Sequence, residues 1–157
     1  MTSPVTITAP EGTPFIEIVR DFDAPIAAVF NAYADPDLVR RWNGPNGYEM
    51  RIDAYDLTTG GRYRYVHADP EGNEYAFTGV FHRVRPDELI IQTFEWEGMP
   101  DEVSLETMRF SDLGDGRTRV SGWSVFPSIE GRDGMIENGM ERGVVEGFER
   151  LDALLAH

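Results

Sequence analysis

The chain ends in a pattern that is typical of an amphipathic helix. From Gly131 onward, apolar residues recur every three or four positions, and acidic or arginine residues fill most of the others. The apolar stripe comprises Ile136, Met140, Val144, Phe148, Leu151, Leu154 and Leu155. We expect one helix of about 25 residues, roughly 37 Å long at 1.5 Å per residue. Such a stripe needs a broad apolar surface to lie on, which a curved sheet provides.

Three glycines interrupt this stripe. Gly143 and Gly147 lie on it and Gly139 lies at its edge, although each glycine inside a helix costs about 1 kcal/mol relative to alanine. One interpretation is close packing, in which glycine lets a strand or an aromatic ring approach the helix backbone. The other is a hollow between helix and sheet, left by the missing side chains. Close packing is favoured for any single glycine, but their grouping keeps the hollow open as an interpretation.

The rest of the chain alternates between apolar and polar positions in the manner of β-strands. We expect strands at residues 15–22, 48–57, 62–67, 74–85, 88–97, 102–111 and 117–126. Two short helices follow the first strand. One is expected to start after Asp23-Ala24-Pro25 with Asp23 as its N-cap, and the other to start at Asp35-Pro36.

These elements predict an α+β fold in a single domain. A seven-stranded antiparallel sheet wraps around the long C-terminal helix, with the two short helices after the first strand. Residues 14–157 form this domain, and residues 1–13 form a lead-in in which residues 5–8 are a candidate edge strand. A length of 157 residues suits one domain with one sizeable core.

Composition narrows the classes of function. With 28 acidic and 14 basic residues the net charge is −14, which disfavours binding to nucleic acids and to anionic lipid surfaces. There is no cysteine, and every basic residue is arginine, which excludes thiolate chemistry, a lysine Schiff base and a P-loop lysine. The histidines are His67, His82 and His157, so we expect no metal site, and we expect no cofactor. Without a membrane span or a signal peptide, the expected location is the cytoplasm, with no membrane insertion.

Strand alternation assigns side chains to the inner, concave face of the sheet. These side chains are mostly apolar or aromatic with a few polar ones, as in small-molecule pockets. Together with positions on the helices, the candidate ligand-binding residues are Trp42, Met50, Tyr63, Tyr65, His67, Phe77, Phe81, Gln92, Phe94, Glu106, Met108, Met140, Gly143 and Gly147. Trp42 is expected near the mouth of the pocket. Ordinary core positions are expected for Phe30, Phe110 and Phe148.

Glu106 and His67 are the candidate catalytic residues. Glu106 shares its strand face with Met108 and Phe110, so its carboxylate is expected to point inward, where burial raises a carboxyl pKa. Such a group is a general base for proton abstraction beside a carbonyl. The favoured alternative is a salt bridge at the strand end or a bulge that turns Glu106 outward, and His67 has the same ambiguity.

The last predicted strand also has an outer face. Trp123 and Val125 have the opposite parity to Val120 and Phe126, so they are expected to face outward. An exposed apolar patch there would suggest a homodimer.

Short motifs along the chain resemble those of a known family. They are Phe22-Asp23-Ala24-Pro25, Asp35-Pro36, Trp42 with Gly44-Pro45, Gly60-Gly61-Arg62-Tyr63, Phe77-x-Gly79, Thr93-Phe94-Glu95, Glu97-Gly98-Met99-Pro100 and Glu149-Arg150-Leu151-Asp152-x-Leu154-Leu155. In this order, over about residues 14–156, the chain resembles the SRPBCC (START-like, Bet v 1-like) superfamily. Within it, the chain resembles the family named for the C-terminal domain of the activator of Hsp90 ATPase. Asn43 departs from the pattern, because relatives often carry a second aromatic residue there.

The resemblance implies a helix-grip fold with a cavity between the sheet and the C-terminal helix. It also implies a hydrophobic small-molecule ligand, but no single reaction, because the fold hosts carriers, cyclases and regulators. Three hypotheses follow. The protein binds a lipid- or polyketide-like molecule, or it is a cofactor-independent cyclase or isomerase that uses Glu106, His67 or a tyrosine, or it is a chaperone-interaction module of the Hsp90 type.

Overall fold

The computed structural model describes residues 4–156, which form one antiparallel sheet and four helices. In chain order the elements are β1 (Thr6–Thr8), β2 (Phe15–Phe22), α1 (Ile26–Ala34), α2 (Pro36–Trp42), β3 (Glu49–Tyr55), β4 (Arg62–Ala68), β5 (Glu74–Arg85), β6 (Leu89–Trp96), β7 (Ser104–Gly114), β8 (Arg117–Val125), α3 (Ile129–Glu137) and α4 (Met140–Leu155). Residues 1–3 of the predicted lead-in and His157 lie outside the described residues.

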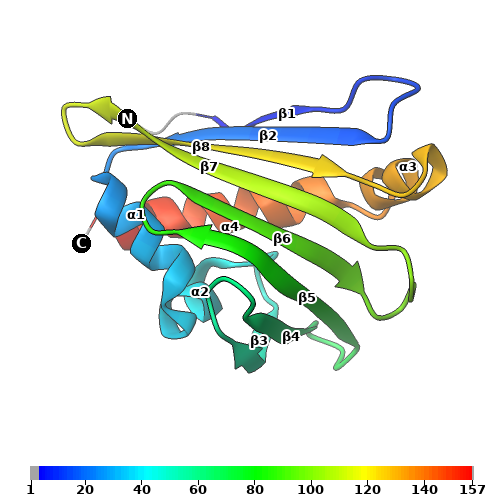
Figure 1. The fold of residues 1–157 in the computed structure, drawn as a ribbon. Helices are drawn as coiled ribbons and strands as arrows, with labels where there is room; N and C mark the ends of the chain where they lie inside the picture. Colours follow the sequence, from blue (N-terminus) through cyan, green and yellow to red (C-terminus); the bar gives the residue numbers. More distant parts are fainter. Residues whose placement is uncertain (1–3, 157) are drawn as a thin grey trace.

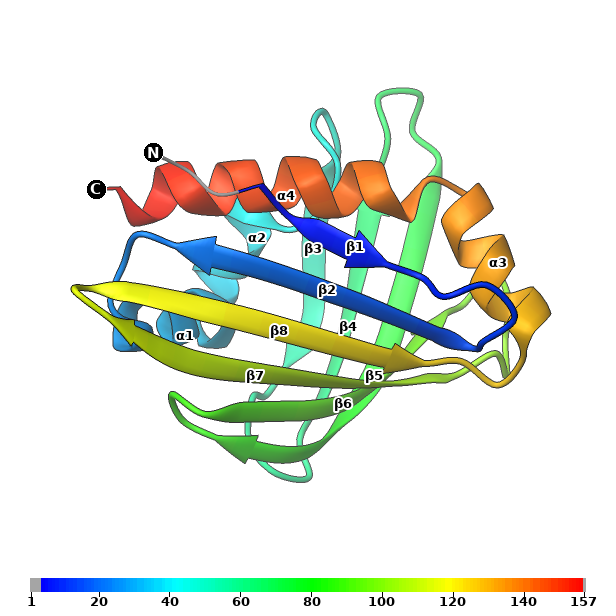
Figure 2. The same cartoon turned by 90° about the horizontal axis from the view of Figure 1, so that it is seen from above.

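The sheet curves around α4. Its strand order is β1-β2-β8-β7-β6-β5-β4-β3, and every neighbouring pair is antiparallel. Helix α4 lies across the concave face, with α1 and α2 at one end of the molecule and α3 at the other (Figures 1 and 2). The predicted α+β fold, with an antiparallel sheet and a C-terminal helix, is confirmed.

The sheet has eight strands where the sequence pattern predicts seven. The additional strand is β1, the candidate edge strand of the lead-in, which pairs with β2 through Thr6 and Val19 at one end. It is three residues long and pairs on one side only, so its sequence carries too few alternating positions to give a clear strand signal.

The prediction of a single long C-terminal helix is wrong, because the chain forms two helices there, α3 and α4. Helix α3 begins earlier than expected, where the Ser128 side chain accepts a hydrogen bond from the Gly131 N–H at 2.9 Å. It ends at Glu137, and Gly139 then adopts the left-handed conformation with φ 82°. That backbone conformation favours glycine and redirects the chain before α4.

The two short helices differ in how they begin. The Asp35 side chain accepts a hydrogen bond from the Asp37 N–H at 2.9 Å and caps α2 as expected. The prediction that Asp23 caps α1 is wrong, because Pro25 occupies the N-cap position. Asp23 instead forms an ion pair with Arg117 at 2.8 Å.

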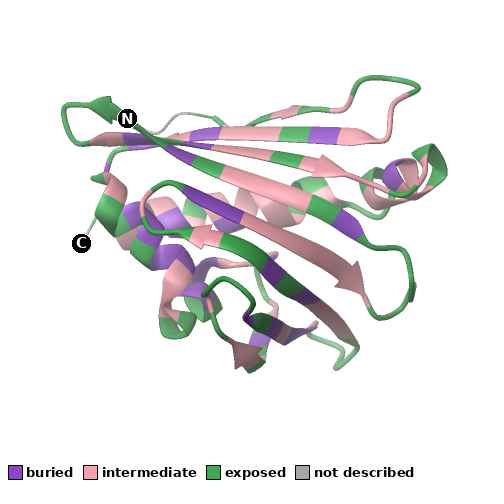
Figure 3. Ribbon diagram, in the orientation of Figure 1, coloured by how far each residue is buried: buried purple, intermediate pink, exposed green. Residues whose placement is uncertain are grey.

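Side chains fill the α1 end of the sheet and leave the α3 end open. Along β6, Leu89 and Ile90 are buried and the residues from Ile91 to Trp96 are only partly buried. Figure 3 shows most buried residues near α1 and α2 and partly buried ones toward α3. The filled end contains ring contacts of Phe110 with Phe30 and Tyr33, at centroid distances of 5.1 and 5.2 Å.

Helix α4 is held by the loop that follows α2. A Cβ atom on Gly147 would lie 3.0 Å from the carbonyl oxygen of Trp42 and 3.4 Å from the amide nitrogen of Gly44. On Gly143 it would meet the ring of Pro45 at 3.6 Å, an ordinary contact. Close packing, the favoured interpretation, therefore holds for Gly147, whereas Gly143 has room for a methyl group and a Cβ on Gly139 would meet nothing within 4 Å.

Alanine at these two glycines should have opposite effects on stability. Gly143→Ala is expected to raise the free energy of unfolding by about 0.5–1 kcal/mol, because the new methyl group fits and the helix loses a glycine. Gly147→Ala is expected to lower it by about 1 kcal/mol or more, because the methyl group crowds two backbone atoms that cannot rotate away. Urea unfolding of both variants beside the wild type measures the difference, and equal effects would contradict the close-packing assignment.

Candidate functional site

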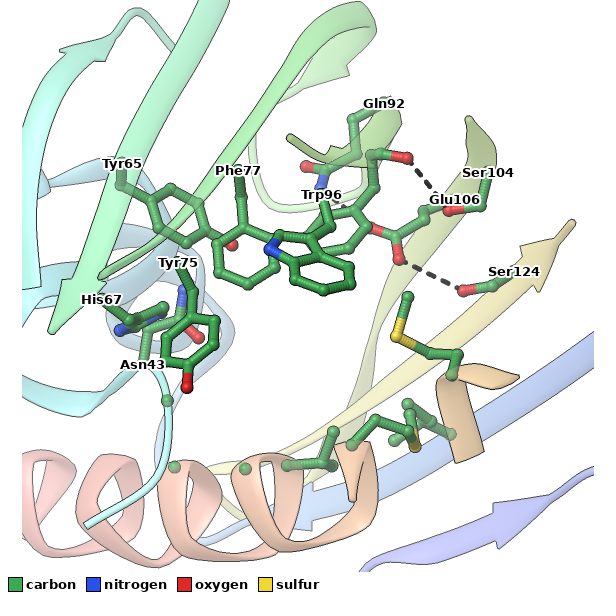
Figure 4. Close-up of a pocket in the computed structure, with 18 of the residues that line it drawn as sticks. Asn43, Tyr65, His67, Tyr75, Phe77, Gln92, Trp96, Ser104, Glu106 and Ser124 are labelled. Atoms are coloured by element: carbon green, nitrogen blue, oxygen red, sulfur yellow. Dashed lines mark hydrogen bonds between the residues drawn. The ribbon is translucent and has the colours of Figure 1, made fainter. Parts of the chain in front are cut away.

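A cavity of about 640 Å³ lies between the concave face of the sheet and α4. The lining residues that are exposed to solvent come from two segments, Met99 and Glu102 after β6, and Asn138 and Gly139 between α3 and α4. The cavity therefore opens between the β6–β7 connection and the α3–α4 junction, away from α1 and α2. Figure 4 shows the lining side chains from strands and α4 around this space.

The structure brings nearly all the predicted ligand-binding residues to this cavity. Its lining includes Trp42, Tyr63, Tyr65, His67, Phe77, Phe81, Gln92, Phe94, Glu106, Met108, Met140, Gly143 and Gly147. Met50 is the exception, because it is buried in the core beside the cavity. Trp42 is also buried rather than at the mouth, and its indole N–H donates to the Ala32 carbonyl at 2.9 Å.

Several lining residues are absent from the predicted set. Strand parity identifies four of them, which are Ser104, Ser124, Tyr75 and Trp96. Each lies two residues from a predicted inner residue of its strand or, for Ser124, from Phe126. Asn43, Tyr48 and Met135 carry no such signal, since they belong to a loop and to the unexpected helix α3. Phe148, expected in the core, lines the cavity as well as packing against the core.

One wall of the cavity consists of aromatic rings that lie nearly parallel. Tyr65 lies 5.8 Å from Tyr63 and 5.4 Å from Phe77, with interplanar angles of 20° and 32°. Phe77 lies 5.2 Å from Phe94 at 26°. The Tyr63 hydroxyl crosses above Gly79, where a Cβ would lie 2.5 Å away, and donates to the Thr93 carbonyl at 2.6 Å. The wall therefore presents a flat aromatic surface with few free polar atoms.

Glu106 points into the cavity between two neutral partners. It pairs in register with Gln92 on β6 and with Ser124 on β8. The Gln92 side-chain amide donates to Glu106 Oε1 at 2.9 Å, and the Ser124 hydroxyl donates to Oε2 at 3.4 Å (Figure 4). The favoured alternative, a salt bridge or an outward-turning bulge, is therefore wrong, since the β7 irregularity lies farther on, at Asp112 and Gly114.

Burial raises the pKa of Glu106 to about 6, because the surrounding protein disfavours the ionised carboxylate. The hydrogen bonds from Gln92 and Ser124 stabilise the carboxylate and partly oppose this rise in pKa. Glu106 is thus a base that is ionised at neutral pH and is protonated under mildly acidic conditions.

His67 lies at the opposite part of the lining. Its ring is buried among Tyr65 and Phe77, and among the described residues its Nδ1 has no hydrogen-bond partner. Burial, helped by the positive charge of Arg150, lowers the pKa of His67 to about 4, so the imidazole is neutral at pH 7.

The two candidate catalytic residues share the cavity without forming a pair. His67 lies opposite Tyr75 on β5, whereas Gln92, the partner of Glu106, lies opposite Phe81 on the same strand. These two positions are six steps apart along β5, or roughly 20 Å at 3.3 Å per step. A reaction that uses both groups on one small substrate atom is therefore not supported by the geometry.

Within residues 4–156, no cluster of three or more histidine, aspartate or glutamate side chains is arranged to hold a metal ion. Over the same part of the chain, no helix combines the length and apolar character that crossing a bilayer requires.

The buried carboxyl group of Glu106 should make stability depend on pH. Its pKa of about 6 in the folded protein lies above the reference value of 4.5, so the folded state binds more protons between these values and loses stability as pH rises through them. Glu106→Gln removes this loss, and is expected to stabilise the protein by up to about 2 kcal/mol more at pH 8 than at pH 4.5. Urea unfolding at both pH values measures the difference, and an effect that is the same at both would contradict the assigned pKa.

Solved structures of similar proteins share this fold. Protein Ms6760 from Mycobacterium smegmatis has 26% identity and a TM-score of 0.87, with 97% of each chain covered. A protein from Arthrobacter aurescens has 27% identity and a TM-score of 0.88, with 98% of this chain and 92% of the other covered. A protein from Rhodobacter sphaeroides has 23% identity and a TM-score of 0.89, with 98% and 99% covered, and shows the fold alone.

No curated protein matches the sequence. The model of the family described as "Activator of Hsp90 ATPase homolog 1-like protein" matches residues 23–156, which is most of the chain and includes every element from α1 to α4. The predicted resemblance is confirmed, and the chain belongs to the Activator of Hsp90 ATPase homolog 1-like family.

Proposed function

We propose that the protein binds a hydrophobic small molecule, lipid- or polyketide-like, in the cavity between the sheet and α4. The observation that carries this proposal is a cavity of about 640 Å³ with an aromatic wall and one inward carboxylate. This volume lies within the range of roughly 300–1,000 Å³ that small-molecule sites occupy. Membership of a family with a ligand-binding fold supports the same function.

The lining explains what such a ligand gains. Apolar surface that leaves water contributes about 25 cal/mol per Å², so a ligand that covers the rings of Tyr65, Phe77 and Phe94 binds mainly through burial. A polar group on the ligand then finds hydrogen-bonding partners at Glu106 and Ser124, which orients the molecule in the cavity.

The hypothesis of a chaperone-interaction module has weaker support. The exposed large apolar residues belong to several elements, with Leu105 on β7, Trp123 on β8 and Ile136 on α3. Trp123 is 39% exposed on the outer face, as expected, and its ring contacts that of Phe15 at a centroid distance of 4.8 Å and an interplanar angle of 34°. A homodimer through this face, a chaperone partner and a cytoplasmic location stay predictions.

A side chain that fills the cavity should abolish ligand uptake. Ser124 faces the cavity, so Ser124→Phe is expected to weaken binding of the neutral fluorescent probe N-phenyl-1-naphthylamine by about tenfold or more, equivalent to 1.4 kcal/mol. Probe fluorescence in a titration measures the affinity, and native mass spectrometry of freshly purified protein, with the denatured mass as control, detects any ligand already bound.

The matched control is Ser121→Phe on the same strand. Ser121 lies on the opposite face with Trp123 and Arg109, outside the cavity. This variant should bind the probe like the wild type. Equal binding by the two variants would remove the cavity from the proposal, and so would the absence of saturable binding to the wild type.

A cofactor-independent cyclase or isomerase is the second candidate function. The observation that favours it is a carboxylate with a pKa of about 6 facing an apolar cavity, the environment that makes a carboxylate an effective base near neutral pH. Glu106 would accept a proton from the carbon beside a carbonyl, leaving an enolate that is reprotonated at carbon.

This activity predicts hydrogen exchange in a bound aromatic ketone. In D₂O the wild type should speed deuterium incorporation beside the carbonyl of 2-tetralone, with a rate that rises as pH passes through about 6. Glu106→Gln should reduce the enzymatic rate at least about 100-fold, the usual scale of general-base catalysis. Mass spectrometry of the recovered ketone measures the exchange. A wild-type rate equal to that in buffer would refute the catalytic function and leave ligand binding standing.

A further inference from the structure

The lining of the cavity contains carboxylates but no arginine. All 14 basic residues of the chain are arginines, and among the described residues none of them lines the cavity. Glu106 lies inside and Glu102 at the opening, while His67 is neutral at pH 7 because burial lowers its pKa to about 4. The interior is therefore electronegative at neutral pH.

The arginines near the cavity are engaged elsewhere. Arg150 donates to the carbonyl of Trp42 at 2.9 Å, at the end of α2. Arg132 pairs with Asp133 at 2.8 Å and donates to backbone carbonyls near β2. These bonds hold the Arg150 guanidinium at the end of α2 and the Arg132 guanidinium beside Asp133 and the start of β2. Neither group therefore supplies a counter-ion to Glu106.

Every element packed around Glu106 presents a neutral group to it. Strands β6 and β8 present Gln92 and Ser124, and β4 presents the phenols of Tyr63 and Tyr65, whose pKa values are raised by burial and by the charge of Glu106. The cavity residues that α3 and α4 contribute include no acid, base or histidine.

The two hydrogen bonds to Glu106 leave part of its bonding capacity free. A carboxylate has about four acceptor positions, and here one oxygen accepts from Gln92 and the other accepts weakly from Ser124 at 3.4 Å. A buried carboxylate without a counter-ion favours a charged donor over a neutral one, because charge-assisted hydrogen bonds are the stronger kind. Aromatic faces next to it, such as those of Tyr65 and Phe77, attract a cation further.

We propose, on the basis of the binding function proposed above, that the ligand is an apolar, aromatic molecule with a protonated amine, and that the amine binds Glu106. The same arrangement disfavours fatty acids and other apolar anions, since a second negative charge beside Glu106 would have no cationic partner.

Three probes that differ only in head group separate these possibilities. They are 1-naphthylmethylamine, 1-naphthylmethanol and 1-naphthoate, which are cationic, neutral and anionic at pH 8. Calorimetric titration in 150 mM salt should show the amine bound about tenfold or more tightly than the alcohol, and the carboxylate bound least. In Glu106→Gln the amine should lose its advantage over the alcohol, while saturable binding of the alcohol shows that the cavity is intact.

A surface substitution controls for the overall negative charge of the protein. Glu88→Gln changes the net charge by the same amount at an exposed position that pairs with Arg85, and it should keep the preference for the amine. An amine preference that survives in Glu106→Gln, or a carboxylate bound as tightly as the amine, would overturn the inference and leave hydrophobic binding intact. Failure of all three probes to bind the wild type would overturn the binding function together with the inference.

Discussion

The contact between α4 and the end of α2 is the constraint on which the cavity depends. Gly147 lets the α4 backbone approach the Trp42 carbonyl and Gly44, and Arg150 donates to that same carbonyl at 2.9 Å. A further hydrogen bond joins the Asn46 N–H to the Glu146 carboxylate at 2.8 Å. Because the helices α1, α2 and α3, rather than any strand, provide the closest backbone neighbours of α4, its apolar stripe bridges the concave face without collapsing onto it. Helix α4 is thus held at a distance from the sheet, and the cavity of the candidate site lies between them.

This arrangement also divides the apolar interior into two parts with different roles. At the α1 end, Phe110, Tyr33, Trp42 and Phe148 form a chain of ring contacts with centroid distances of 5.2, 4.9 and 6.2 Å, and this packing stabilises the fold. Tyr33, Trp42 and Phe148 also border the cavity, and toward the α3 end further aromatic residues line the space without filling it. Packing at one end holds the walls apart at the other, so the proposed ligand would meet a cavity that is already formed.

The sequence predicts the walls of this site better than its boundaries. Alternation in β4 to β7 identifies the inner residues correctly, because the strands are regular where they face the cavity. It fails at Met50, whose parity is right but whose side chain is buried in the core cluster. It also fails for the break at Gly139, since a glycine within a helical pattern looks the same whether it packs closely or redirects the chain. The orientation of Glu106 follows from parity, whereas the neutrality of its surroundings depends on where distant arginines are engaged, which no local pattern contains.

The carboxyl group of Glu106 links stability to function. Its ionised form lowers stability at neutral pH, because burial opposes ionisation and only neutral groups of the protein form hydrogen bonds with it. Glutamine, nearly identical in shape, would avoid that cost. Local choices that oppose stability are typical of functional sites, where the missing partner is supplied by a ligand or by a substrate proton. Both proposed functions supply such a partner, an amine in one and a proton taken from carbon in the other. The unneutralised carboxylate, more than the volume around it, therefore distinguishes this cavity from a simple packing defect.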